Sequence, residues 1–149
     1  MKHLKIVFLL FLFISVLLIS NSAIAVDPNQ VLNNLPKKWE GTFTWHDTSR
    51  PVQKITITIT DVSIDSAGNI IALCDGIYYK EHEVQFNAKW SINPESLRFE
   101  MWESEPKPST SIVTDGSHIG KISSGLDKIE AVWTTISSGE KGDLFLQPK

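Results

Sequence analysis

The segment 53–64 constrains the fold more than any other stretch, because β-branched apolar residues alternate with hydroxyl residues over most of its length. Successive side chains of a strand point to opposite faces, so Ile55, Ile57 and Ile59 share one face and the threonines share the other. β-Branched side chains also favour extended backbone. The segment therefore predicts a long strand with one face in a core and one face in water.

From Trp39 onward the chain repeats segments of this kind, with no apolar helical period longer than about two turns. Short connections rich in Gly, Asn, Asp and Pro separate them, as tight turns require. Short links place consecutive strands side by side, which predicts an antiparallel up-and-down meander. The predicted strands cover residues 39–46, 53–64, 70–80, 82–92, 97–103, 110–122 (interrupted), 128–136 and 142–147.

Three places depart from regular alternation. After Thr60 the apolar residues continue in the opposite phase, Gly76 interrupts the third strand, and residues 115–118 break the sixth. A β-bulge at each of the first two accounts for the change and helps a sheet to curl. Eight twisted strands leave two unpaired edges unless the first and last strands pair. We therefore predict an all-β fold in which the meander closes into a small barrel, with a β-sandwich as the alternative.

The first 25 residues have the composition of an export signal. Lys2, His3 and Lys5 precede an almost wholly apolar stretch at 6–19, and Ala23-Ile24-Ala25 offers the small residues that a signal peptidase accepts. Fourteen residues of helix span roughly 21 Å, which is short of a bilayer core of about 30 Å. We expect a signal peptide over 1–25, no stable membrane anchor after cleavage, and an extracytoplasmic protein, either periplasmic or secreted.

The remaining chain divides into a polar lead-in at 26–38 and a single β-barrel domain at 39–149. Val31, Leu32 and Leu35 predict a short helical turn in the lead-in that plugs one end of the fold. Removing Lys2 and Lys5 leaves 12 Lys and Arg against 17 Asp and Glu, a net charge of −5. Scattered lysines on an acidic chain form no clustered basic face, so nucleic acid is not an expected partner.

The single cysteine, Cys74, lies in the apolar run 70–74. One cysteine forms no intramolecular disulfide, although exported proteins usually enter oxidising compartments. We predict that Cys74 is a small buried hydrophobic residue rather than a reactive thiol. The core must then be stable without a covalent cross-link.

The opening and closing segments carry a family resemblance. The chain opens its first strand with Trp39-x-Gly41-x-Phe43 and closes with Trp133, the glycines of the 139–142 turn, and Leu144-x-Leu146. Together with a signal peptide and a mature chain of this length, these features resemble the calycin-like barrels, of which lipocalins and avidin-like proteins are examples. The resemblance implies the barrel architecture and carries over no ligand and no site residue.

In such a meander the ends of the odd-numbered strands share one rim. That rim collects aromatic and polar residues and the two longest predicted loops, 47–52 and 104–109, whereas the other rim holds tight turns. Barrel mouths are common ligand sites. Six of the seven predicted site residues are expected to point inward because of their phase in the strands. The seventh, Tyr79, is included because it lies at the same rim. The predicted ligand-binding residues are Trp45, Asp47, Tyr79, His82, Glu103, Trp133 and Thr135.

An eight-stranded barrel is only wide enough for its own side chains or one small ligand. The predicted inward residues are bulky, so a large cavity is not expected: Phe43, Ile55, Ile57, Ile59, Phe86, Trp90, Phe99 and Met101. Two hypotheses stay open. One is a small-ligand pocket at the rim, and the other is a plugged barrel that works through its outer surface, where Trp102 is predicted to be exposed.

Motifs of enzymes are absent from the chain, which has no Gly-x-Ser-x-Gly, no His-Glu-x-x-His and no phosphate-binding glycine loop. Glu100 and Glu103 fall on opposite faces of a strand, which is poor geometry for an acid–base pair. A hydrolase would require His82 within hydrogen-bond reach of a rim carboxylate. His46, His82 and His118 lie on separate predicted loops and are expected to be surface residues rather than metal ligands.

We therefore expect a non-enzymatic binding protein with no catalytic residue, metal or cofactor. Its site would lie at the rim formed by the ends of the odd-numbered strands, and its partner would be a small molecule or a protein. The alternative is a protein–protein interaction module, such as an inhibitor or an envelope component.

Overall fold

The computed structural model describes residues 27–108 and 112–149, so the predicted signal peptide lies outside the described residues. The strands are β1 (Lys38–Trp45), β2 (Gln53–Ile64), β3 (Ile70–Tyr79), β4 (Glu83–Ile92), β5 (Arg98–Lys107), β6 (Gly116–Ile122), β7 (Ile129–Thr135) and β8 (Lys141–Pro148), preceded by the helix α2 (Pro28–Asn34). Each strand pairs antiparallel with its neighbours in the sequence.

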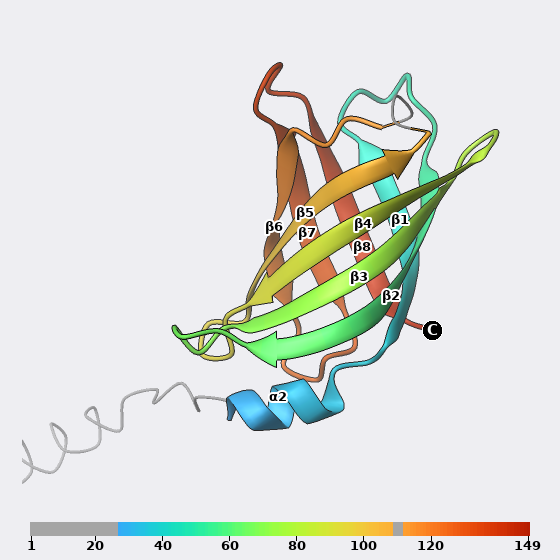
Figure 1. Cartoon of the computed structure of the whole chain (residues 1–149). Coiled ribbons are helices and arrows are strands. Elements are labelled where there is room, and N and C mark those ends of the chain that lie inside the picture. Colours follow the sequence, from blue (N-terminus) through green and yellow to red (C-terminus); the bar gives the residue numbers. More distant parts are fainter. Residues whose placement is uncertain (1–26, 109–111) are drawn as a thin grey trace, which may run out of the picture.

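The sheet closes on itself because β1 pairs with β8 as well as with β2, from Trp39–Pro148 to Trp45–Gly142. Figure 1 shows the resulting barrel, in which the ends of β1, β3, β5 and β7 lie at the rim opposite α2. Pairing of the first and last strands removes both free edges of the sheet. The prediction of a closed all-β meander is confirmed, and the sandwich alternative is excluded.

The barrel interior is filled by side chains over most of its length. All eight residues predicted to be inward and bulky are buried, and Trp39, Leu144 and Leu146 complete a continuous core with them. Cys74 is buried as predicted, and burial raises the pKa of its thiol. Trp102 lies on the outer face with 40% of its surface exposed, so its predicted outward direction is also confirmed.

One predicted bulge is present and the other is not. The β2–β3 register shifts between Ile59 and Asp61, which confirms the bulge at Thr60. Gly76 lies in regular register with Ile57 and Phe86, so the predicted bulge there is wrong. A Cβ at Gly76 would meet the Phe86 ring at 2.1 Å, and glycine is therefore required for the close approach of this ring.

Several strand ends differ from those expected from the sequence. β4 begins at Glu83, which leaves His82 in the turn before it, and Gly116–His118 belong to β6 rather than breaking it. Thr110, the predicted start of the sixth strand, lies outside the described residues. β5 continues to Lys107, where a loop was predicted. Beyond Met101, β5 pairs only with β4, so its other edge is unpaired. Proline is tolerated at such an edge, which explains why the strand can include Pro106.

The end of the barrel away from this rim is covered by α2. Asp27 caps the helix by accepting a hydrogen bond from the backbone N–H of Asn29 at 2.9 Å, and Pro28 occupies the first turn. Val31 and Leu35 are buried against the core, and α2 contacts β2 and β3. The predicted helical turn that plugs one end is therefore present.

No helix within the described ranges is long and apolar enough to cross a membrane.

Candidate functional site

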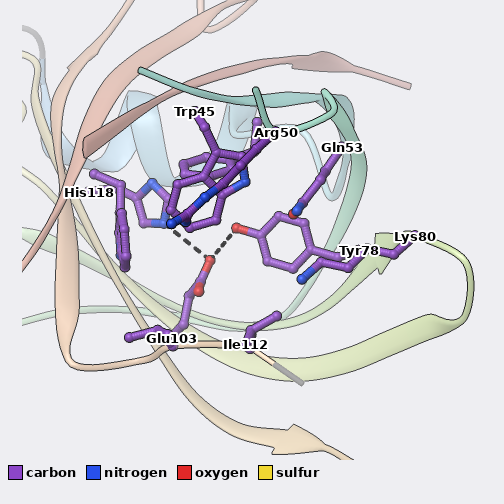
Figure 2. Close-up of a pocket in the computed structure, with 11 residues that line it drawn as sticks. Trp45, Arg50, Gln53, Tyr78, Lys80, Glu103, Ile112 and His118 are labelled. Carbon is purple, nitrogen blue, oxygen red and sulfur yellow. Dashed lines mark hydrogen bonds and ion pairs between the residues drawn. The ribbon is translucent and has the colours of Figure 1, made fainter. Parts of the chain in front are cut away.

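A pocket of about 150 Å³ opens at the rim formed by the ends of the odd-numbered strands. Figure 2 shows its lining, in which Glu103 points between Tyr78 and His118 and Arg50 lies across Trp45. The residues that line it come from six strands and three connecting segments: Phe43, Trp45, Arg50, Gln53, Tyr78, Lys80, Glu103, Ile112, Val113, His118 and Trp133. We call this hollow the rim pocket.

Aromatic rings form one side of the rim pocket. Phe43 is the centre of this group, with its ring centroid 5.0 Å from that of Trp45 and 5.9 Å from that of Trp133. Trp45 and Trp133 meet edge to face at 5.5 Å. Gly142 makes this arrangement possible, because a Cβ there would lie 2.3 Å from the Phe43 ring. Edge-to-face contacts of this kind hold rings in defined orientations, so this wall of the pocket is preorganised.

A buried polar network forms the floor. The Tyr78 hydroxyl donates a hydrogen bond to Glu103 Oε1 at 2.6 Å, and His118 Nε2 lies 3.1 Å from the same oxygen. The Glu103 and His118 side chains are only 5% and 1% exposed. Burial raises the pKa of Tyr78 well above its ordinary value of 10.0, and the adjacent Glu103 raises it further. Tyr78 is therefore a hydrogen-bond donor throughout the physiological pH range.

The two nitrogens of the His118 ring lie in different surroundings. Nε2 faces Glu103 Oε1, and an ionised carboxylate there accepts a hydrogen bond when Nε2 carries a proton. His118 Nδ1 is buried and has no hydrogen-bond partner within the described residues. Both hydrogen bonds to Glu103 end on Oε1, so neither uses Oε2. The network is thus anchored on one oxygen of a single buried carboxylate.

The positions of Glu103 and His118 follow from the way β5 and β6 separate. These strands pair from Arg98–Lys121 to Met101–His118 and no further. Glu103 follows Met101 by two residues and shares its inward face, as strand geometry requires. His118 pairs with Met101 at the rim end of the β5–β6 ladder, which brings the Glu103 and His118 side chains together. The polar floor therefore lies where β5 has lost its β6 neighbour.

Arg50 spans the mouth of the rim pocket. Its guanidinium carbon lies 4.4 Å from the centroid of the Trp45 ring, within the range of a cation–π contact. It pairs through Nη2 with Glu140 in the β7–β8 turn and through Nε with Asp47 on its own loop, the latter at 3.6 Å. The Arg50 side chain is 39% exposed. Arg50 thus joins two loops across the opening and presents one face to the pocket.

Lys80 places a second cation in the lining. Burial lowers the pKa of Lys80 from its ordinary value, and the nearby carboxylate of Glu103 opposes this shift. Gln53, which is 8% exposed, adds a neutral amide on the same side. The pocket therefore combines an aromatic wall, one buried carboxylate and two cationic side chains.

Three of the seven predicted site residues line the rim pocket: Trp45, Glu103 and Trp133. Thr135 is buried as predicted but serves the β7–β8 turn, where its hydroxyl accepts hydrogen bonds from the backbone N–H groups of Ser137 and Ser138. Asp47 was predicted to point inward, and this is wrong because it is exposed in the loop after β1. Hydrogen bonds from Ser49 lower the pKa of Asp47, with Arg50 adding to the effect.

Tyr79 and His82 lie on the outside of the rim. They line a wider and shallower hollow of about 620 Å³ that includes Val52, Lys80 and Pro108. The predicted inward position of His82 is wrong because the residue belongs to an exposed turn and not to β4. Regular alternation through Gly76 turns Tyr78 inward and Tyr79 outward, whereas a bulge at Gly76 would have reversed them.

Sequence reasoning also missed His118 and Arg50. His118 was expected on a surface loop, and the structure corrects this to a buried strand position. Counting back by twos from the apolar Ile122 places residue 118 on the inward face, so the signal was present in the sequence. The position of Arg50 depends on Glu140, which is ninety residues away in the chain. No local pattern predicts such a contact.

The described residues contain no group of three or more His, Cys, Asp or Glu side chains placed to hold a metal ion. No protein-family model matches the chain, and no curated protein is found as a relative. The class of protein is therefore defined by its fold and its pocket and not by sequence similarity. The chain forms a small eight-stranded antiparallel β-barrel, closed at one end by a helix and hollowed at the other into a pocket with a polar floor.

Proposed function

We propose that this chain is an exported, non-enzymatic protein of calycin-like architecture that binds a small ligand in the rim pocket. The observation that carries the proposal is the combination of a preorganised aromatic wall with the buried Tyr78–Glu103–His118 network in one concave site. Ligand sites are typically concave and mostly apolar, with few fixed polar groups. The rim pocket has this composition.

The volume of the rim pocket limits the ligand. An apolar cavity of about 150 Å³ accommodates one benzene-sized molecule, and the rim pocket is of this size. The filled core beneath it leaves no room for a long acyl chain or a large ring system. The proposed ligand is thus about one ring in size, with its remainder at the mouth beside Arg50.

Native mass spectrometry tests the proposal. The mature protein, purified gently from its extracytoplasmic compartment, should carry a small additional mass that is lost on denaturation. Val113→Trp should remove this mass by filling the mouth, since Val113 is a half-exposed lining residue. The matched control is Val132→Trp on the outer barrel face, which should retain it. The proposal fails if the parent and both variants are bare, or if Val113→Trp keeps the added mass.

A second candidate function is a protein–protein interaction module. Its support is a group of exposed apolar side chains across the outer faces of β5, β6 and β7. Ile119 pairs directly with Val132 and with Glu100, and Trp102 follows Glu100 by two residues on the same face of β5. Aromatic residues are enriched at interfaces. A co-purifying protein that Trp102→Ser releases, while Val113→Trp does not, would favour this function.

A further inference from the structure

The charges around the rim pocket indicate which ligand it would accept, and this inference rests on the proposed function. Two cations, Arg50 and Lys80, line the pocket beside one carboxylate, Glu103. The carboxylate already accepts hydrogen bonds from Tyr78 and His118. The acidic partners of Arg50, Asp47 and Glu140, stand outside the lining. Within the lining itself, cationic side chains therefore outnumber carboxylates by two to one.

Arg50 has donors left for a ligand. It faces Glu140 with Nη2 and Asp47 with Nε, and neither pair uses Nη1. A guanidinium carries five N–H donors in a planar fork that suits carboxylates. Because Arg50 is stacked on Trp45, its position is defined relative to the aromatic wall. An anionic group bound to Nη1 would lie beside the edge of a ring held in that wall.

We propose that the rim pocket binds a small aromatic monocarboxylate, with its ring among Phe43, Trp45 and Trp133 and its carboxylate at the mouth beside Arg50 and Lys80. The ring then separates the ligand carboxylate from Glu103, which limits repulsion between the two. A cationic ligand of the same size, placed in the same way, would bring its charge beside the cations Arg50 and Lys80.

Benzoate, benzamide and benzamidinium test the charge preference, because they share one ring and differ in charge. Isothermal titration calorimetry or ligand-observed NMR on the mature protein should give benzoate the highest affinity, about fivefold or more above benzamide for an ion pair at a half-exposed site. Benzamidinium should be the weakest of the three. Tighter binding of benzamidinium than of benzoate would overturn the proposal and assign Glu103 as the ligand-binding charge.

Arginine variants locate the carboxylate. Arg50→Gln should weaken benzoate about fivefold and leave benzamide nearly unchanged. The matched control is Arg98→Gln, which removes the chain's other arginine, also paired with a glutamate but on the rim covered by α2. Glu140→Gln should strengthen benzoate, since it removes a competitor for Arg50. A structural role for Arg50 alone would predict weaker binding in both Arg50→Gln and Glu140→Gln.

Glu103→Gln gives opposite outcomes for the two charge assignments. If the site selects anions, the Glu103→Gln variant should bind benzoate as well as or better than the parent. If Glu103 instead holds a cation, this variant should lose benzamidinium binding. Circular dichroism of each variant confirms that the barrel is folded. If all three probes bind the rim pocket equally, the charge assignment fails and the proposed function stands. If none binds up to millimolar concentration, the charge assignment fails and native mass spectrometry decides the proposed function separately.

Discussion

Removal of the Tyr78 hydroxyl gives the most direct estimate of what the buried network contributes to stability. Tyr78→Phe deletes the donor that lies 2.6 Å from Glu103 Oε1 and keeps the ring, which stacks on Phe86 with centroids 4.9 Å apart. A hydrogen bond to a buried charged group contributes about 1.5–3 kcal/mol to stability. We therefore expect a loss of about 2 kcal/mol in the free energy of unfolding at neutral pH.

For a barrel of this size, that loss corresponds to a decrease in Tm of about 6–10 °C. Thermal and urea denaturation followed by circular dichroism measure it. The neighbouring tyrosine is the matched control, because Tyr79 is 39% exposed and its hydroxyl has only a long contact, 3.4 Å, with Thr56 Oγ1. Tyr79→Phe should change stability by no more than about 0.5 kcal/mol.

A double-mutant cycle with Glu103→Gln assigns the energy to the Tyr78–Glu103 contact. Against a neutral amide, the hydrogen bond falls to about 1 kcal/mol, so Tyr78→Phe should cost about half as much in that background. Equal costs in both backgrounds would refute the reasoning, because the charge of Glu103 would then not be the source of the effect. Equal costs for Tyr78→Phe and Tyr79→Phe would refute it as well.

Three further predictions follow from the same structure. Gly76→Ala should destabilise the barrel by about 1–3 kcal/mol in urea unfolding, since its Cβ would overlap the Phe86 ring, whereas Gly125→Ala, with no contact shorter than 3.6 Å, should be far milder. Above about pH 10 the unfolded chain releases the Tyr78 proton, whereas the folded chain keeps it because burial raises the pKa of Tyr78. The contribution of this group to stability is therefore present in full below about pH 10 and is lost as the pH rises further. Urea titrations at several pH values should show a shallower alkaline decrease for Tyr78→Phe, and an unchanged slope would contradict the burial argument. If residues 1–25 are a cleaved signal peptide, as we propose, intact-mass measurement of the protein purified after expression of the full chain should give a chain that begins at Val26, and retention of residues 1–25 would contradict this proposal.

The barrel could be predicted from the sequence because its signal is local and repeated. Alternation like that of residues 53–64 recurs in most of the strands, and short turn sequences leave few ways to connect them. The same alternation identified the bulky inward residues and the bulge at Thr60. Closure followed from the physical cost of free edges rather than from any one residue, and the β1–β8 pairing confirms it.

The site was only partly predictable, because small errors of phase reverse the face of a residue. Gly76 was read as a bulge, although it is a regular strand position whose missing side chain admits Phe86. Regular alternation through this position turns Tyr78 inward and Tyr79, the predicted site residue, outward. Early breaking of the sixth strand similarly hid His118, which the spacing from Ile122 places on the inward face. Regular alternation of inward and outward positions therefore indicates the correct face for both Tyr78 and His118.

Other features of the site depend on contacts between residues that are distant in sequence. Arg50 reaches the pocket mouth because Glu140 and Trp45 hold it there. Glu103 was identified from its position at the rim, but its donors come from β3 and β6. Such arrangements emerge only after closure of the barrel fixes the relative positions of the strands.

The central claim is that the rim pocket binds a ligand, and the indole N–H signals of the five tryptophans test it directly. Trp45 and Trp133 line the pocket, Trp39 and Trp90 are buried in the core, and Trp102 lies on the outer face. A ¹H–¹⁵N NMR titration with benzoate, benzamide and benzamidinium should give saturable shifts for Trp45 and Trp133 with at least one probe, and little change in the other three. Saturable shifts confined to Trp102 would contradict the claim, because they would place binding on the outer face of the barrel.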